Sequence, residues 1–140
     1  MFKHLSLFFI AAIVIVACSE KENKCDLITP TIPVVDFTIV DQQGHTLIGD
    51  SNVYHPDSIF VLYNNRPLSI TNSDSVMRFN FEIGETSESY LLVLNNTELD
   101  TLNITYYTEQ GECFNTYIAN VFSLNGIPQN KINNTFIIRK

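Results

Sequence analysis

Basic side chains are scarce in this chain. Eight Lys and Arg stand against fifteen Asp and Glu over 140 residues, which gives a formal net charge of −7 at pH 7. The basic residues form no patch along the sequence, and phosphate contacts need clustered Lys and Arg. The composition therefore predicts no nucleic-acid partner and no electrostatic binding to anionic headgroups, and solubility alone accounts for the acidity.

Catalytic signatures are also missing. No serine lies in Gly-x-Ser-x-Gly or Ser-x-x-Lys, and there is no glycine-rich phosphate loop. Asp50, His55 and Asp57 lie close in sequence, but they lack the alternating acids and central Gly of a calcium loop. We interpret them as loop residues that flank a strand. The sequence predicts no enzyme, no cofactor and no metal site.

The sequence contains a single long apolar run, at residues 5–16. It follows a basic tip at Lys3 and precedes the small residue Ala17, which are the three parts of an export signal. Spanning a bilayer takes about 20 residues, so a cleaved signal is favoured over a transmembrane helix. Its removal takes away Lys3 and no acid, so the mature chain is slightly more acidic than the whole.

The run closes on Ile15-Val16-Ala17-Cys18, which resembles the lipobox of bacterial lipoproteins. The resemblance implies that the Cys18 sulfur receives a diacylglycerol, that the peptide is cut before it, and that the new amino group is often acylated too. Two or three acyl chains bind a membrane far more durably than one. The alternative is an ordinary secretory signal cut near Ala17, with Cys18 left as a free or paired thiol.

Three segments follow from this organisation: a signal peptide at residues 1–17, a lipidated N-terminus and flexible tether at 18–33, and one domain at 34–140. Residues 19–24 carry no apolar side chain and cannot bury surface. Polar and acidic residues directly behind the cysteine resemble the surface-export signals of lipoproteins from Bacteroidota-type bacteria. That resemblance implies exposure on the outer face, whereas a plain solvated linker explains the same residues and leaves the membrane face open.

Period-two alternation of apolar and polar residues dominates the chain from residue 34 onward, and no helical stripe is present. The predicted strands are residues 34–40, 46–48, 58–63, 75–83, 90–94, 101–108, 113–124 and 135–138. Turn residues separate them, including Asn64-Asn65, Gln110-Gly111, Asn125-Gly126 and Asn133-Asn134. Seven or eight short strands predict an all-β fold, an antiparallel β-sandwich of immunoglobulin-like or transthyretin-like type.

Tryptophan is absent, so the Cys and Trp core of antibody domains is absent too. The predicted core is aromatic, with Phe37, Phe60, Phe79, Phe81, Phe122 and Phe136. With its lipobox, the chain resembles the small single-domain β-sandwich lipoproteins of Bacteroidota-type bacteria. The resemblance implies a lipid-anchored protein of the cell envelope, at the outer membrane, and supplies no site residues.

Two cysteines remain after lipidation, Cys25 near the tether and Cys113 at the start of a predicted strand. Disulfides persist in exported proteins, so the two can pair. In the chain-entropy model such a bond stabilises by about 4 to 5 kcal/mol. Two free thiols are the alternative, and no histidine has the spacing of a zinc site with either cysteine.

A tripeptide of acid, hydroxyl residue and aliphatic residue occurs three times, around Ser58, Ser75 and Thr101. It resembles the O-glycosylation motif of Bacteroidota-type bacteria, which makes these three residues candidate modification sites. The alternative is that all three are starts of strands, where an Asp turn before an apolar residue is common.

Two classes of function remain. The first is a non-catalytic binding or interaction module displayed on the lipid anchor, which contacts a glycan or an envelope protein through loops; Tyr54 with Asn52 and His55 is the best glycan-binding feature. The second is a structural or accessory subunit of an outer-membrane or envelope complex. It would pair through an edge strand, for which residues 135–138 are the candidate.

Overall fold

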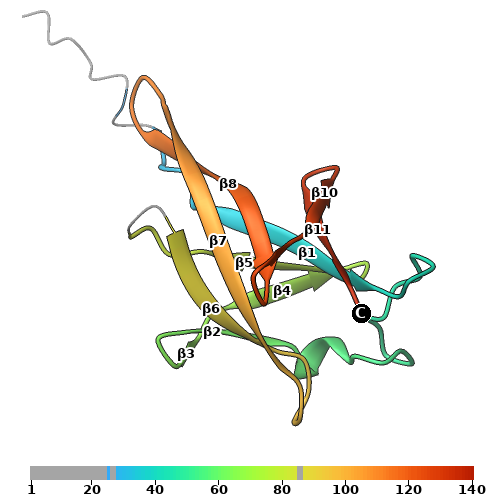
Figure 1. Cartoon of the computed structure of the whole chain (residues 1–140). Helices are drawn as coiled ribbons and strands as arrows, with labels where there is room; N and C mark the ends of the chain where they lie inside the picture. Colours follow the sequence, from blue (N-terminus) through green and yellow to red (C-terminus); the bar gives the residue numbers. More distant parts are fainter. Residues whose placement is uncertain (1–24, 26–27, 85–86) are drawn as a thin grey trace, which may run out of the picture.

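The computed structural model describes residues 25, 28–84 and 87–140 (Figure 1). Residues 1–17 and Cys18 lie outside the described residues, as does most of the tether, so the predicted signal and lipidation site stay predictions. In the part of the chain that is described, no helix has the length and apolar character needed to cross a membrane.

Strands make up almost all of the regular structure. They are β1 (Val34–Val40), β2 (Phe60–Tyr63), β3 (Arg66–Pro67), β4 (Ile70–Ser73), β5 (Val76–Asn80), β6 (Ser87–Val93), β7 (Leu99–Gln110), β8 (Asn115–Leu124), β9 (Ile127–Pro128), β10 (Asn130–Ile132) and β11 (Thr135–Arg139). One short 3₁₀ helix, η2 (Pro56–Ser58), precedes β2.

Two sheets pack face to face, in the orders β10-β11-β1-β5-β4 and β3-β2-β6-β7-β8-β9 (Figure 1). The predicted β-sandwich is confirmed. One pairing differs from the antiparallel expectation, because β11 runs parallel to β1 with Phe37 opposite Phe136. One edge of β1 is paired with β5. After the β10–β11 hairpin the chain runs along the other edge of β1, in the same direction as β1.

The core lies between the inner faces of the two sheets and is largely aromatic. Phe37 contacts Phe79 from its own sheet and Phe122 from the opposite sheet, each at a ring separation of 6.1 Å. Phe122 also stacks on Phe136 at 4.9 Å. Phe60 is the exception to the predicted core: it is 48 % exposed, because its neighbours Ile59 and Val61 take the inward positions and Phe60 points the other way.

Left-handed turns define the register of the hairpins. Asn64 and Asn65 have φ values of 50° and 61°, and Asn133 and Asn134 have 47° and 66°, as two-residue turns between right-twisted strands require. Both turns were predicted from the sequence. Asp74-Ser75 joins β4 to β5 in the same conformation, with φ values of 48° and 68°, and was not recognised as a turn.

Several predicted strand boundaries were wrong. Residues 46–48 make only isolated bridges, Val40 to Thr46 and Ile48 to Tyr54. The predicted strand 75–83 ends at Asn80, and β4 and β10 were not anticipated. Both missed strands are short and exposed, so they carry no alternating apolar pattern for the sequence to show.

Candidate functional site

The outer face of the sheet β3-β2-β6-β7-β8-β9 carries apolar side chains in cross-strand rows. Phe60 lies opposite Val93, which lies opposite Leu99. In the next row Leu62 lies opposite Leu91, which lies opposite Thr101. Phe60, Leu91 and Leu99 are 48 %, 38 % and 64 % exposed. Cross-strand neighbours share a face, so these side chains form one continuous apolar surface in solvent.

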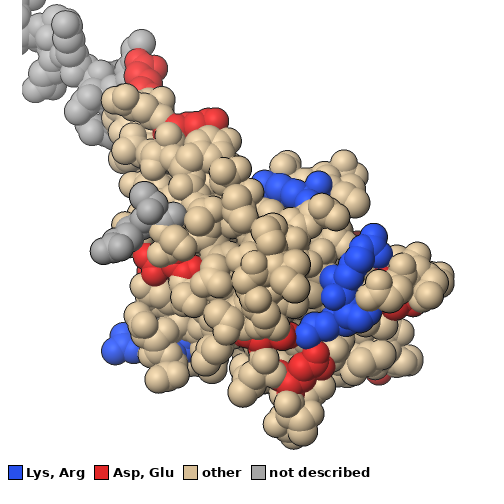
Figure 2. Space-filling view, viewed as in Figure 1, with Lys and Arg blue, Asp and Glu red and all other residues tan. Residues whose placement is uncertain are grey.

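This outer face is also free of charge over the body of the sheet. From the Leu99 end of β7 as far as Thr105, before Tyr107 and Glu109 continue the outer side toward the β7–β8 tip, the outward positions are Pro67, Phe60, Leu62, Ser87, Ser89, Leu91, Val93, Leu99, Thr101, Asn103, Thr105, Val121, Ser123 and Pro128. None of these described positions is Asp, Glu, Lys or Arg. Figure 2 shows the same pattern, with no blue or red over the middle of the face and charged residues around its margins. We call this surface the uncharged face.

The outer face of the other sheet is different. There Arg78 donates from Nε and a terminal nitrogen to both oxygens of Asp36, at 2.6 Å each, across the β1–β5 pair. The Asp36 carboxylate raises the pKa of the exposed Arg78 guanidinium by hydrogen bonding and charge. A charged, solvated outer face is the ordinary condition of a sandwich, so the uncharged face requires an explanation.

A polar cluster lies at the Leu99 end of the uncharged face. Lys140 Nζ donates to Glu98 Oε1 at 2.6 Å and to Asp100 Oδ2, and Asp100 is buried. Asn125 Nδ2 donates to the other Asp100 oxygen at 2.6 Å, and the Tyr54 hydroxyl donates to Glu98 Oε2 at 2.9 Å. The cluster ties the segment after β11 to β7 and to the loop before η2.

The pKa values in this cluster follow from its contacts. Burial alone would lower the pKa of Lys140, but hydrogen bonds to Asp100 and Glu98 outweigh burial and raise it. Burial, with the hydrogen bond to Glu98, raises the pKa of Tyr54 to about 12. Every buried side-chain nitrogen or oxygen in the described residues has a hydrogen-bond partner, and the contacts of this cluster are accounted for by a structural role that joins Lys140 to β7.

The loop candidates from the sequence come together but remain in solvent. His55 Nε2 lies 3.6 Å from Asp50 Oδ1, and all the side chains involved are more than half exposed. His55 Nδ1 accepts the backbone N–H of Asp57 at 3.3 Å and so caps η2. Within the described residues no group of three or more His, Cys, Asp or Glu could hold a metal ion. Tyr54 is buried, so the predicted glycan-binding feature has no aromatic ring on the surface from this residue.

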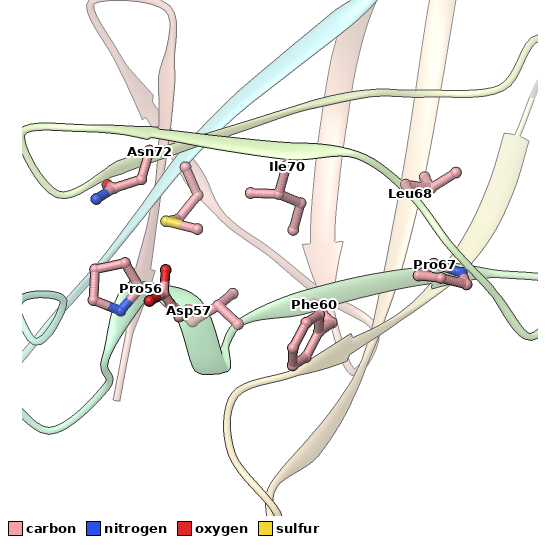
Figure 3. Close-up of a pocket in the computed structure, with 9 residues that line it drawn as sticks. Pro56, Asp57, Phe60, Pro67, Leu68, Ile70 and Asn72 are labelled. Atoms are coloured by element: carbon pink, nitrogen blue, oxygen red, sulfur yellow. The ribbon is translucent and has the colours of Figure 1, made fainter.

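The two sheets leave a groove on the side where β2 and β4 face each other (Figure 3). It has a volume of about 400 Å³, is open to solvent, and is lined by Phe60, Leu68, Ile70 and Met77 among others. Beside it, β4 pairs only with β5 and presents its other edge to solvent. An extended segment of another chain could pair there.

The candidate modification sites lie at three different places. The Ser58 hydroxyl donates to the carbonyls of His55 and Leu94, at 2.8 and 3.0 Å, and the Ser75 hydroxyl donates to the Ile48 carbonyl at 2.9 Å. Thr101 lies on the uncharged face, beside Leu91. Asp100, the acid of its tripeptide, is buried against Lys140, so in the folded domain the motif around Thr101 is less accessible than the other two.

Cys25 and Cys113 form a disulfide with their Cα atoms 5.3 Å apart. The pairing predicted from the sequence is therefore present. Cys113 lies between β7 and β8, so the bond attaches the N-terminal segment to the tip of that hairpin and not to the core. Figure 1 shows the hairpin tip next to the incoming N-terminal segment.

The sequence did not identify the uncharged face. Residues 90–94 were read as a central strand because both their faces are apolar, and β6 does lie between β2 and β7. Among the described residues none covers the outer side of β6, where Leu91 is 38 % exposed, and the sequence alone does not show this. Comparison of the chain with protein-family models, with curated proteins and with solved structures finds no match.

Proposed function

We propose that this protein is a non-catalytic interaction module of the cell envelope, held to the membrane by lipid on Cys18, which docks a partner protein on the uncharged face. The observation that carries the proposal is the continuous apolar surface of Phe60, Leu62, Leu91, Val93 and Leu99 in an acidic protein. Large apolar patches rimmed by polar residues mark protein interaction sites.

A protein partner fits this face better than a glycan does. Exposed apolar side chains here are aliphatic apart from Phe60, and sugar stacking favours aromatic platforms with polar groups beside them. A flat sheet face without charge costs little desolvation when another apolar surface covers it. The partner's contact surface should accordingly be apolar and uncharged at its centre.

Introduction of a charge on the face tests this proposal. Leu91→Lys places an ammonium group in the middle of the apolar rows, and Asn80→Lys places the same group on the exposed outer face of the other sheet. Lipidated wild type and both variants are cross-linked in membranes of the native cell. We expect a cross-linked partner that is retained by Asn80→Lys and lost from Leu91→Lys, with both variants folded by circular dichroism. Retention of the same partner by folded Leu91→Lys would exclude the uncharged face.

The lipid anchor has its own test. Within the mature chain no apolar run approaches the length of a membrane span, so lipid must supply the affinity. Cys18→Ser should move the protein from the membrane fraction to a soluble or unprocessed form. A processed Cys18→Ser protein that still pellets with membranes after a high-salt wash would contradict the anchor.

The second candidate function, an accessory subunit that pairs through an edge strand, is supported by β4 and not by the predicted strand 135–138. β11 lies between β10 and β1 and has no free edge. Among the outermost strands, β3 and β9 have two residues each and contain Pro67 and Pro128, whereas β4 has four residues and no proline. Asn72→Lys on β4 should abolish an edge-paired complex and leave a complex on the uncharged face intact.

A further inference from the structure

The disulfide joins the N-terminal segment to the part of the domain farthest from the polar cluster. β7 has twelve residues, so its ends lie about 36 Å apart at roughly 3.3 Å per residue. Leu99 at one end is next to Glu98 and Asp100, and Gln110 at the other end is next to the loop that holds Cys113. The bond thus attaches the N-terminal segment to the Gln110 end of β7 and not to the Leu99 end.

We propose that the Cys25–Cys113 disulfide determines which end of the sandwich faces the bilayer, so that the β7–β8 tip points toward the lipid and the Leu99 end points away. This inference rests on the proposed lipid on Cys18. Six residues separate Cys18 from Cys25, so seven Cα steps join them, and even fully extended these reach only about 25 Å. With the 5.3 Å between the Cα atoms of Cys25 and Cys113 added, the hairpin tip lies at most about 30 Å from the Cys18 backbone.

Without the disulfide the restraint is much looser. The next backbone attachment is at Pro33, whose carbonyl accepts the N–H of Phe81 at 3.2 Å. Fourteen residues separate Cys18 from Pro33, and the fifteen Cα steps between them reach about 50 Å when extended. A tether of that length exceeds the long dimension of β7 and lets either end of the sandwich approach the lipid. The disulfide shortens the reach to about 30 Å, which is less than the length of β7, so the domain can no longer stand upright with its Leu99 end on the lipid.

Charge at the hairpin tip does not provide an alternative restraint. Glu109 and Glu112 lie on either side of the turn, and residues 107–116 contain no Lys or Arg. Attraction to anionic headgroups needs basic residues, so the tip has no electrostatic hold on a bilayer. A covalent link close to the anchor is the feature of the described chain that keeps this end near the membrane.

The orientation has a consequence for the partner. The strands of the uncharged face run along the same direction as β7, so with the tip toward the lipid this face points sideways, parallel to the membrane plane. A surface that points sideways is accessible to a neighbour in the same membrane. The partner we infer is therefore a second envelope protein that is itself anchored or embedded beside this one.

Fluorescence transfer to the membrane tests the orientation. The lipidated protein is inserted into phosphatidylcholine vesicles that carry an acceptor dye on a fraction of their headgroups. A donor dye is attached through an azide-bearing residue at position 112 or at position 96, so that the native cysteines are untouched. We expect strong transfer from position 112 and clearly weaker transfer from position 96, with the two converging after reduction or in the Cys25→Ser/Cys113→Ser variant.

The outcomes are separable from those of the proposed function. If the protein does not pellet with vesicles, the lipid anchor has failed; the chain from residue 19 is then held through an N-terminal histidine tag on nickel-chelating lipid and the same two donors are compared. Equal transfer from positions 112 and 96 with the disulfide intact, or stronger transfer from 96, would overturn the orientation in either format. Circular dichroism of the double serine variant confirms that its sheets are retained.

Discussion

Replacing Lys140 with methionine should destabilise the domain strongly for a single change near its surface. Lys140 Nζ lies between Glu98 and Asp100, and Asp100 is buried with its other oxygen occupied by Asn125. Methionine keeps an unbranched apolar side chain as far as the ε position and removes the ammonium group. Two carboxylates are then left close together without a cation, one of them out of contact with water.

The expected cost is about 2 to 3 kcal/mol. Breaking a fully buried pair costs roughly 3 to 5 kcal/mol, because an uncompensated charge stays in the interior. The side chains of Lys140 and Glu98 are 20 % and 34 % exposed, so water screens part of that loss and the lower end applies. For a domain of this size, each kcal/mol lowers the midpoint of thermal unfolding by roughly 4 °C, which gives a decrease of about 8 to 12 °C.

Urea and thermal unfolding of Lys140→Met, Asp100→Asn and the double variant measure this effect as a double-mutant cycle. The double variant should be more stable than the sum of the two single changes predicts, because it has no buried charge to compensate. Arg78→Met, which breaks the exposed pair with Asp36, is the matched control and should have a clearly smaller effect. A Lys140→Met effect no larger than that of Arg78→Met would refute the argument from burial.

Three further predictions concern pH, the disulfide and a turn. The pKa of Tyr54 is raised from 10.0 to about 12 and that of Lys140 is raised too, so their stabilisation is complete below about pH 10 and decreases as the pH rises toward and through the folded values. Between pH 8 and pH 11, urea unfolding should show a loss of about 1.4 kcal/mol from Tyr54, which Tyr54→Phe abolishes. Cys113→Ser should cost about 2 kcal/mol in urea unfolding and not the 4 to 5 expected from the sequence, because the native chain also closes a short loop between Cys25 and Pro33 when the bond forms. Asn65→Ala should lower stability by about 1 kcal/mol and Asn65→Gly should not, because φ is 61° at this position; equal effects of the two would show that the backbone conformation is not the cause.

The sequence predicted the fold class well because the core signal is local. A strand that buries one face must alternate, and β1, β7 and β8 were placed within two residues of their observed bounds. Paired asparagines marked the turns for an equally local reason, since they tolerate positive φ. The cysteine pairing could also be predicted, because the lipobox resemblance assigns Cys18 to lipid and leaves two other cysteines, although two free thiols remained the alternative until the structure placed Cys25 and Cys113 in a bond.

What the sequence missed depends on which elements become neighbours. β11 alternates like any half-buried strand, and nothing in residues 135–138 shows that β1 and β10 cover both of its edges. Phe60 was assigned to the core because an aromatic residue inside an apolar run is usually buried, but the pleat directs it outward. Asp100 and Lys140 are 40 positions apart, so their contact has no local signal either.

The uncharged face and the strand edges of this sandwich bear on the same question, namely where another molecule can bind without causing aggregation. Sandwich proteins aggregate most readily through long, exposed edges. Three of the four edge strands here, β3, β9 and β10, have only two or three residues, two of them with proline, and the fourth, β4, has four residues. Protection of these edges leaves the outer face of the longer sheet as the apolar surface that stays open. Exposed apolar rows do not contribute to the solubility of this acidic protein. A partner that covers these rows therefore explains them better than the stability of the isolated domain does.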